Sequence, residues 1–191
     1  MKRIGLLFGS FNPPHIGHLA LANYILEYAG RDEIWFIVSP HNPLKEASEL
    51  VDEDIRLDMV SRSILSEPRF KASAYEFSLP RPSYTIDTLD SLAADFPDCD
   101  FSLIIGSDNY LSLDKWKDKD RLVRDYKLLV YPRFGFPIAC DDISQNVKVV
   151  KAPRFEISST MIREAIRQNK SIRFWLPCGI YDYILERNLY K

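Results

Sequence analysis

The chain has 191 residues, of which 46% are hydrophobic and 27% charged, values typical of a globular protein. This length predicts a single domain, residues 1–191, with room for an ordinary hydrophobic core. The net charge of −2 and the pI near 5.9 exclude a general attraction to nucleic acid, so any phosphate-binding site must be local.

Neither the N-terminus nor the cysteines indicate export. The first apolar run is far shorter than a secretory signal, and no run approaches the ~20 apolar residues of a membrane span. Cys99, Cys140 and Cys178 are widely spaced and outside any CxxC motif, which predicts neither a disulfide framework nor a zinc site. We therefore expect a cytoplasmic protein without membrane or nucleic-acid partners. Homo-oligomer formation remains open.

Strand-like apolar runs alternate with helical patterns along the chain. Strands are predicted at 3–8, 33–39, 70–77, 100–105, 127–132 and 146–152. Helices are predicted from near Gly17 to Gly30 and at 52–66, 85–96, 118–126, 158–169 and 179–188. This order predicts an α/β fold: a doubly wound, mainly parallel sheet with helices on both faces and a small C-terminal helical extension. Ligands of such sheets bind beyond the C-terminal strand ends, where the loops after Phe8, Ser39 and Ile105 fall.

The turn after the first predicted strand, residues 9–18, reads Gly-Ser-Phe-Asn-Pro-Pro-His-Ile-Gly-His. A helix that begins near its end directs free backbone N–H groups at a crevice, which suits a phosphate. His15 and His18 are three residues apart and can share one side of that helix start. Either histidine alone is better explained as a loop cap or a buried polar residue. Their combination with Gly9, Pro14 and Gly17 favours phosphate binding.

Lys45 ends a second loop, Ser39-Pro-His-Asn-Pro-Leu-Lys45, and is its only cation. Prolines hold this loop extended directly after a strand. Alone, such a lysine is most simply a solvated surface residue. Beside the first motif it becomes a candidate phosphate contact.

A third motif lies at residues 157–163, Ile-Ser-Ser-Thr-Met-Ile-Arg. Ser158 is a natural N-cap, which predicts another helix start with free N–H donors. Ser159 and Arg163 are four residues apart on one helix face, where a hydroxyl and a guanidinium could grip a polyphosphate. A capped amphipathic helix with one exposed arginine explains the local pattern equally well. The side chains expected to turn toward the core are Met161, Ile162, Ala165 and Ile166.

These motifs resemble the (H/T)xGH, proline-rich lysine loop and ISSTxIR motifs of the Rossmann-like nucleotidyltransferase superfamily. The segments 83–89 and 106–109, followed by Lys115-Trp116-Lys117, are similar to those of bacterial nicotinate-nucleotide adenylyltransferases. The resemblance extends from Ile4 to Tyr190. Phe8 and Asn12 depart from it, since many members have Gly and Asp there.

The resemblance implies transfer of AMP from ATP, carried with Mg²⁺, to nicotinate mononucleotide, with the helices from about residue 158 completing the ATP site. It implies a catalytic set that supplies donors and positive charge, namely His15, His18, Lys45 and Arg163. The expected ATP contacts are Gly9, Ser10, Phe11, His18, Gly106, Asp108, Ile157, Ser158, Ser159 and Arg163. The expected contacts to nicotinate mononucleotide are Ser10, Asn12, His15, Lys45, Thr85 and Trp116. No protein ligand to the metal is expected.

Residue chemistry supports such a step. A phosphate monoester is largely dianionic at pH 7 and needs no general base, and the sequence shows no Ser-His-Asp or Cys-His signature. Trp116, between two lysines, is expected to be partly exposed. Asp108 could bind a ribose hydroxyl or be a structural residue of a turn. Adenylyl transfer to nicotinamide mononucleotide or phosphopantetheine, and a catalytically silent nucleotide-binding domain, remain alternatives.

Overall fold

The computed structural model describes residues 1–40, 50–138 and 145–191. Its six strands form one sheet in the order β3-β2-β1-β4-β5-β6, and every adjacent pair is parallel. The strands are β1 Lys2–Gly9, β2 Glu33–Val38, β3 Phe70–Ser73, β4 Cys99–Gly106, β5 Lys127–Tyr131 and β6 Val147–Val149. This is the Rossmann strand order, in which the chain reverses direction across the sheet between β1 and β4. The predicted doubly wound α/β fold is confirmed.

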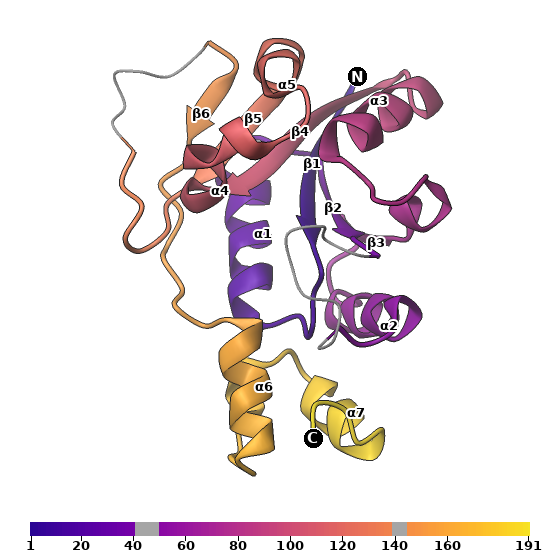
Figure 1. Cartoon of the computed structure of the whole chain (residues 1–191), viewed down its shortest axis with the longest axis vertical. Helices are drawn as coiled ribbons and strands as arrows, with labels where there is room; N and C mark the ends of the chain where they lie inside the picture. The colour runs from indigo at the N-terminus through magenta and orange to yellow at the C-terminus, as the bar shows by residue number, and fades with distance from the viewer. Residues whose placement is uncertain (41–49, 139–144) are drawn as a thin grey trace.

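Helices cover both faces of the sheet (Figure 1). On one face, α1 (Ile16–Tyr28) and α2 (Glu53–Ser63) pack on a core that includes Leu7 of β1. On the other, α3 (Thr85–Asp95) and α5 (Lys119–Asp125) pack on a core that includes Leu6. Adjacent residues of a strand point to opposite faces of the sheet. Because both faces are covered by helices, both need apolar side chains, and the strands read as continuous apolar runs in the sequence.

The C-terminal extension consists of α6 (Ser159–Arg167), a 3₁₀ turn η5 (Arg173–Trp175) and α7 (Ile180–Glu186). Figure 1 shows α6 and α7 below the sheet, at the end opposite the N-terminus. Their apolar side chains form a third cluster, which also contains Met59 of α2. The extension is therefore joined to the main core through α2.

The strand predicted at 70–77 is wrong in its second half, because β3 ends at Ser73 and a 3₁₀ turn, η2 (Tyr75–Ser78), follows. Its neighbour in the sheet, β2, pairs with it no further than Ser73, and within the described residues no ladder continues beyond that point. Besides η2 and η5, the short elements that were not predicted are α4 (Ser107–Leu111) and η3 (Leu113–Lys115). Met161 is 43% exposed and does not face the core, whereas Ile162, Ala165 and Ile166 are buried as expected.

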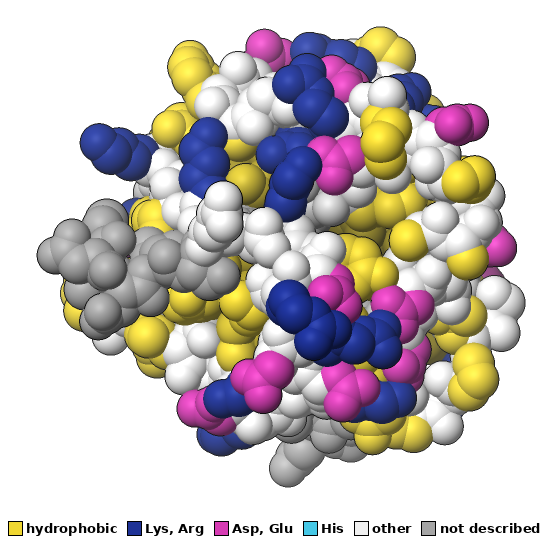
Figure 2. Space-filling view, turned by 90° about the horizontal axis from the view of Figure 1, so that it is seen from above, with side chains coloured by type: hydrophobic (Ala, Val, Ile, Leu, Met, Phe, Trp, Pro, Cys, Tyr) yellow, Lys and Arg dark blue, Asp and Glu magenta, His cyan; other side chains and the backbone are white. Residues whose placement is uncertain are grey.

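Figure 2 looks onto the end of the molecule at which the N-terminus lies, where Lys and Arg side chains lie next to Asp and Glu. Several ion pairs form at the N-terminal ends of the strands, such as Arg3 with Asp32 at 2.8 Å and Lys127 with Asp100 at 2.7 Å. None of the helices described has the length and apolar character of a membrane span.

Candidate active site

The turn after β1 is shaped by Phe11, whose backbone adopts a φ of +45° and whose side chain is 2% exposed. A Cβ on Gly9 would lie 2.9 Å from Phe11 Cζ, so glycine is required beneath this ring. The ring also meets the edge of the His18 imidazole at 5.1 Å between centroids. The Phe11 side chain is thus part of the core, and a nucleotide could reach only its backbone.

The two imidazoles lie together at the start of α1, stacked with ring centroids 3.7 Å apart. The backbone N–H of His15 donates to Nδ1 of His18 at 3.2 Å. An accepting Nδ1 carries no proton, so neutral His18 holds its proton on Nε2. The predicted placement of both histidines on one side of the helix start is confirmed.

His15 differs electrostatically from the expectation. Burial, with a smaller contribution from the positive charge of Arg133, lowers the pKa of His15 from 6.5 to about 4. The ring is therefore neutral at pH 7 and can donate a hydrogen bond but adds no positive charge. Within the expected set of donors and positive charges, His15 therefore belongs with the donors, which its sequence neighbours did not reveal.

The N-terminus of α6 docks on the β1–α1 turn. The Ser158 side chain accepts a hydrogen bond from the Met161 N–H at 3.2 Å, which confirms the predicted N-cap. Ser159 Oγ donates to the Pro13 carbonyl at 2.8 Å, and Arg163 Nη1 donates to the Asn12 carbonyl at 3.1 Å. Two motifs about 150 residues apart thus form one site, with Ser159 and Arg163 directed to the same place. Ile157, just before the cap, packs against the C-terminal cluster.

Asn12 is 3% exposed, and its side chain binds within the protein. Its Oδ1 accepts from the Tyr190 hydroxyl at 3.0 Å and from the Val51 N–H at 3.3 Å. These contacts describe Asn12 as an anchor of the turn, although the sequence suggested a substrate contact. Lys45 lies outside the described residues.

At the end of β4, Gly106 leads into α4 and lies beside the Asp108 carboxylate. A Cβ at position 106 would collide with this carboxylate, so glycine allows the close approach. The Nε of Arg133 lies 3.5 Å from the Asp108 carboxylate, and the Arg133 N–H donates to Ser107 Oγ at 2.8 Å. The ends of β4 and β5 are thereby joined next to the histidines.

The segments that carry Thr85 and Trp116 are joined on the other face of the sheet. Thr85 is the first residue of α3, and half-buried Trp116 follows η3. Lys117 joins these segments, because its Nζ lies 2.8 Å from both carboxylate oxygens of Asp87 and 5.1 Å from the Tyr84 ring centroid. A ligand across the C-terminal edge between β1 and β4 could contact this pair and the histidines at once.

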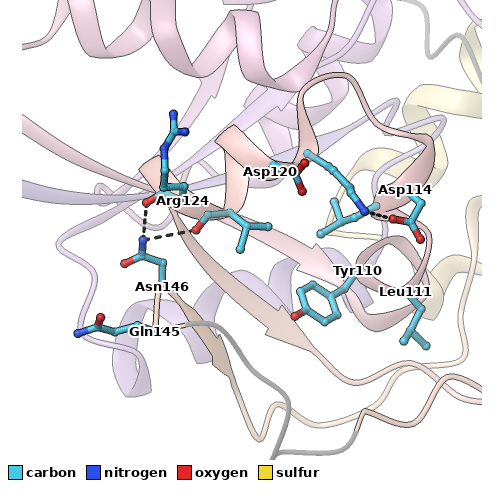
Figure 3. A pocket seen from close by; sticks show the side chains of 10 residues that line it. Tyr110, Leu111, Asp114, Asp120, Arg124, Gln145 and Asn146 are labelled. Carbon is cyan, nitrogen blue, oxygen red and sulfur yellow. Dashed lines mark hydrogen bonds and ion pairs between the residues drawn. The ribbon is translucent and has the colours of Figure 1, made fainter.

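A surface pocket of about 740 Å³ lies elsewhere, beside α5 and the segment before β6 (Figure 3). Some of its polar side chains are engaged within the protein: Lys119 pairs with Asp114, and Asn146 Nδ2 donates to the Arg124 carbonyl at 2.6 Å. None of the motif residues lines it. Motif chemistry and strand topology, rather than concavity, locate the candidate site.

Sequence reasoning missed three buried polar residues near this edge: Arg56, Glu76 and Tyr190. Arg56 had a signal, since it stands three and four residues before Met59 and Val60 on the apolar face of the predicted helix. Glu76 accepts a 2.8 Å hydrogen bond from Thr88 Oγ1, and burial raises its pKa. Neither Glu76 nor Tyr190 had a comparable local signal.

Comparisons with known proteins agree with this geometry. The family model described as cytidylyltransferase-like matches residues 6–165. A "Probable nicotinate-nucleotide adenylyltransferase" of Bacteroides fragilis (strain YCH46) is 49% identical over 97% of this chain and 92% of its own length. The protein of the same name from Azobacteroides pseudotrichonymphae genomovar. CFP2 is 46% identical over 99% of both chains.

A solved structure of Plasmodium falciparum nicotinic acid mononucleotide adenylyltransferase, complexed with NaAD, has the same fold, with a TM-score of 0.84. It is 20% identical in sequence and aligns over 100% of this chain and 98% of its own. The chain belongs to the cytidylyltransferase-like family, among the probable nicotinate-nucleotide adenylyltransferases.

Proposed function

We propose that this chain transfers the AMP moiety of ATP to nicotinate mononucleotide, forming deamido-NAD and pyrophosphate, a reaction of NAD biosynthesis. The observation that carries the proposal is the docking of α6 on the β1–α1 turn. It brings the stacked imidazoles of His15 and His18 to the start of a second helix that bears Ser159 and Arg163. Such a set of N–H and O–H donors suits a polyphosphate. The names of relatives 46–49% identical also support it.

The chemical step needs positioning and charge neutralisation, because the attacking phosphate is already a dianion. His18 presents its Nε2–H to the α-phosphate, since its Nδ1 accepts the His15 N–H. His15 donates a hydrogen bond to the incoming phosphate without adding charge. Arg163, with Ser159, binds the β- and γ-phosphates, and Lys45 contributes a cation toward the reacting phosphates.

The remaining contacts divide between the two substrates. Backbone groups of residues 9–11 and 157–158 approach the ATP phosphates and adenosine, and Asp108 at the end of β4 accepts from a ribose hydroxyl. Trp116 stacks on the pyridine ring, for which its partial exposure suits it. The nicotinate carboxylate lies near Thr85, where free N–H groups of α3 begin.

Mg²⁺ carried with ATP would supply neutralisation of charge on the phosphate oxygens. Within residues 1–40, 50–138 and 145–191, no group of three or more His, Cys, Asp or Glu side chains is arranged to hold an ion. Imidazole N–H, hydroxyl and guanidinium groups suit phosphate oxygens and not a cation. The triphosphate and water would therefore hold the ion, as Mg²⁺ commonly requires.

We also propose that residues 1–191 act as one nucleotidyltransferase domain, with the helices from about residue 158 completing the ATP site. Met59 of α2 belongs to the apolar cluster of the extension, and α6 bonds directly to the β1–α1 turn. Separating the extension from the sheet would expose this cluster and remove Arg163 from the site.

The test is pyrophosphate release from Mg·ATP with nicotinate mononucleotide, nicotinamide mononucleotide or phosphopantetheine as acceptor. We expect nicotinate mononucleotide to be preferred over the amide by roughly 10²–10⁴ in kcat/KM, because an amide leaves about two buried donors unpaired at about 1–3 kcal/mol each. Equal use of acid and amide would contradict the assignment. Nucleotide binding without release for any acceptor would indicate a silent binding domain.

A further inference from the structure

Arg56 of α2 has a fully buried side chain, with an exposed fraction of 0%. A buried cation is unfavourable unless other groups replace its water. No ion pair to Arg56 occurs within the described parts of the chain, and its hydrogen bonds go to backbone carbonyls. Nε donates to the Val51 carbonyl at 2.7 Å, Nη1 to those of Ser10 and Ser39 at 2.7 and 2.8 Å, and Nη2 to that of Pro40 at 2.9 Å.

These carbonyls belong to three separate segments at the C-terminal edge of the sheet. Ser10 lies in the turn that leads to the histidines, Ser39 and Pro40 follow β2, and Val51 precedes α2. One further backbone bond joins the first two segments, from the Ser39 N–H to the Gly9 carbonyl at 2.9 Å. The planar guanidinium holds all three segments at fixed distances, which a lysine with its single ammonium could not reproduce.

We propose that Arg56 is a positioning residue for adenylyl transfer, which sets the β1–α1 turn against the end of β2 and thereby places His15 and His18 against the substrate phosphates. The inference rests on the proposed function. Arg56 is buried and touches no substrate, so it acts through the backbone that it holds. A displacement of the turn by a fraction of an ångström would affect the reacting geometry more than substrate binding.

The competing explanation is that Arg56 only stabilises the fold. Two variants, Arg56→Lys and Arg56→Gln, and the control Leu122→Ala separate the explanations. Leu122 is fully buried on α5, on the opposite face of the sheet, and its truncation costs about 2–5 kcal/mol of stability. The Leu122→Ala control therefore lowers stability without a change at the β1–α1 turn.

We expect kcat of both Arg56 variants to fall about 10–100-fold, with KM for each substrate changing less than about threefold. Leu122→Ala should keep wild-type kcat at temperatures where it is folded. A second readout does not depend on turnover: NMR titration of the His15 imidazole, in a chain with three histidines. Its pKa of about 4 should rise toward 6.5 in the Arg56 variants and stay unchanged in Leu122→Ala.

Folded Arg56 variants with wild-type kcat and an unchanged His15 titration would overturn the proposal. So would a loss of kcat in Leu122→Ala equal to theirs, or failure of both Arg56 variants to fold while the control folds. Failure of the proposed function is a different result, namely a wild-type protein that does not adenylylate nicotinate mononucleotide. In that case the His15 titration still decides whether Arg56 positions the turn.

Discussion

At the start of α1, the imidazole of His15 is 6% exposed and lies against the ring of His18. A protonated ring would be a buried cation near the charge of the exposed Arg133 side chain. The site therefore avoids two adjacent positive charges at pH 7. In the proposed complex, His15 is a neutral donor, and positive charge for the phosphates comes from arginine and lysine residues.

This burial predicts a measurable pH dependence of stability. The His15 pKa is about 4 in the folded chain, against 6.5 when unfolded, so between these values only the unfolded chain takes up the proton. The stability contributed by neutral His15 is complete above pH 6.5 and is lost as the pH falls toward 4. Between pH 7.5 and 5 the loss should be about 2 kcal/mol.

Urea unfolding of wild type and His15→Asn at both pH values measures this effect. Other titrating groups are common to both proteins, so the difference between their pH dependences isolates His15. The variant should lose about 2 kcal/mol less than wild type between the two pH values. Parallel pH dependences would show that His15 titrates normally in the folded chain.

The donor on His18 yields a second prediction. His18→Ala removes the Nε2–H and should lower kcat/KM by about 10²–10³, the contribution of one preorganised transition-state donor. His18→Gln returns an N–H near the same position and should recover part of the loss. Steady-state kinetics with both variants provide the test. If His18→Ala kept more than about half of wild-type kcat/KM, the assignment of His18 to the α-phosphate would be wrong.

At the scale of elements, two adjacent residues at the start of α6 have different roles. Ser158 caps the helix, and Ser159 reaches across to the turn that precedes α1. The cap therefore fixes where the next hydroxyl and the guanidinium one turn later are directed. Loss of the cap bond should therefore lower both the free energy of unfolding and the affinity for the ATP phosphates.

Ser158→Ala should lower the free energy of unfolding by about 1 kcal/mol, the usual cost of losing an N-cap. KM for ATP should rise more than KM for nicotinate mononucleotide, because α6 faces the triphosphate in the proposed complex. Ser158→Asn is the matched control, since asparagine caps equally well. Thermal unfolding and initial rates, measured on wild type and both variants, test these expectations. An unchanged melting temperature in Ser158→Ala would show that the cap bond contributes nothing.

At the scale of the whole molecule, the two ends of the sequence meet. The Tyr190 hydroxyl donates to Asn12 Oδ1 at 3.0 Å across 178 positions, and the side chain is 9% exposed. Burial raises the pKa of Tyr190, so the hydroxyl keeps its proton at neutral pH. The C-terminal segment thus stabilises the same turn that Arg56 and α6 hold.

Tyr190→Phe leaves the ring but removes this hydrogen bond, and should cost about 1–2 kcal/mol of stability. Because Asn12 belongs to the β1–α1 turn, kcat should fall as well. Tyr126→Phe is the control, since its hydroxyl donates to Asp90 at 2.7 Å between α5 and α3. That variant should lose stability with wild-type kcat. Equal kcat in both variants would show that the C-terminal contact is structural only.

The doubly wound fold was predictable from local patterns. Apolar runs and helical spacing locate all six strands and the six longer helices. A helix or strand that buries one or both faces must carry apolar residues at the spacing of that element, and this spacing is visible in the sequence. The position of the motif at residues 9–18, between a strand and a helix, was predictable, and so was the N-cap at Ser158. The short elements after β4, α4 and η3, could not be predicted, because neither is long enough to show a helical period of apolar residues.

The sequence by itself determined the elements, the edge of the sheet at which the motif residues gather, and the residue types available there. Tertiary structure alone decided how those residues are used, because hydrogen bonding and burial depend on neighbours distant in the chain. Burial made His15 neutral, contact with Tyr190 and Val51 turned Asn12 into an anchor, and four carbonyls from three segments accommodated the charge of Arg56. Desolvation and the geometry of donors and acceptors are properties of the folded chain, and no local pattern encodes them.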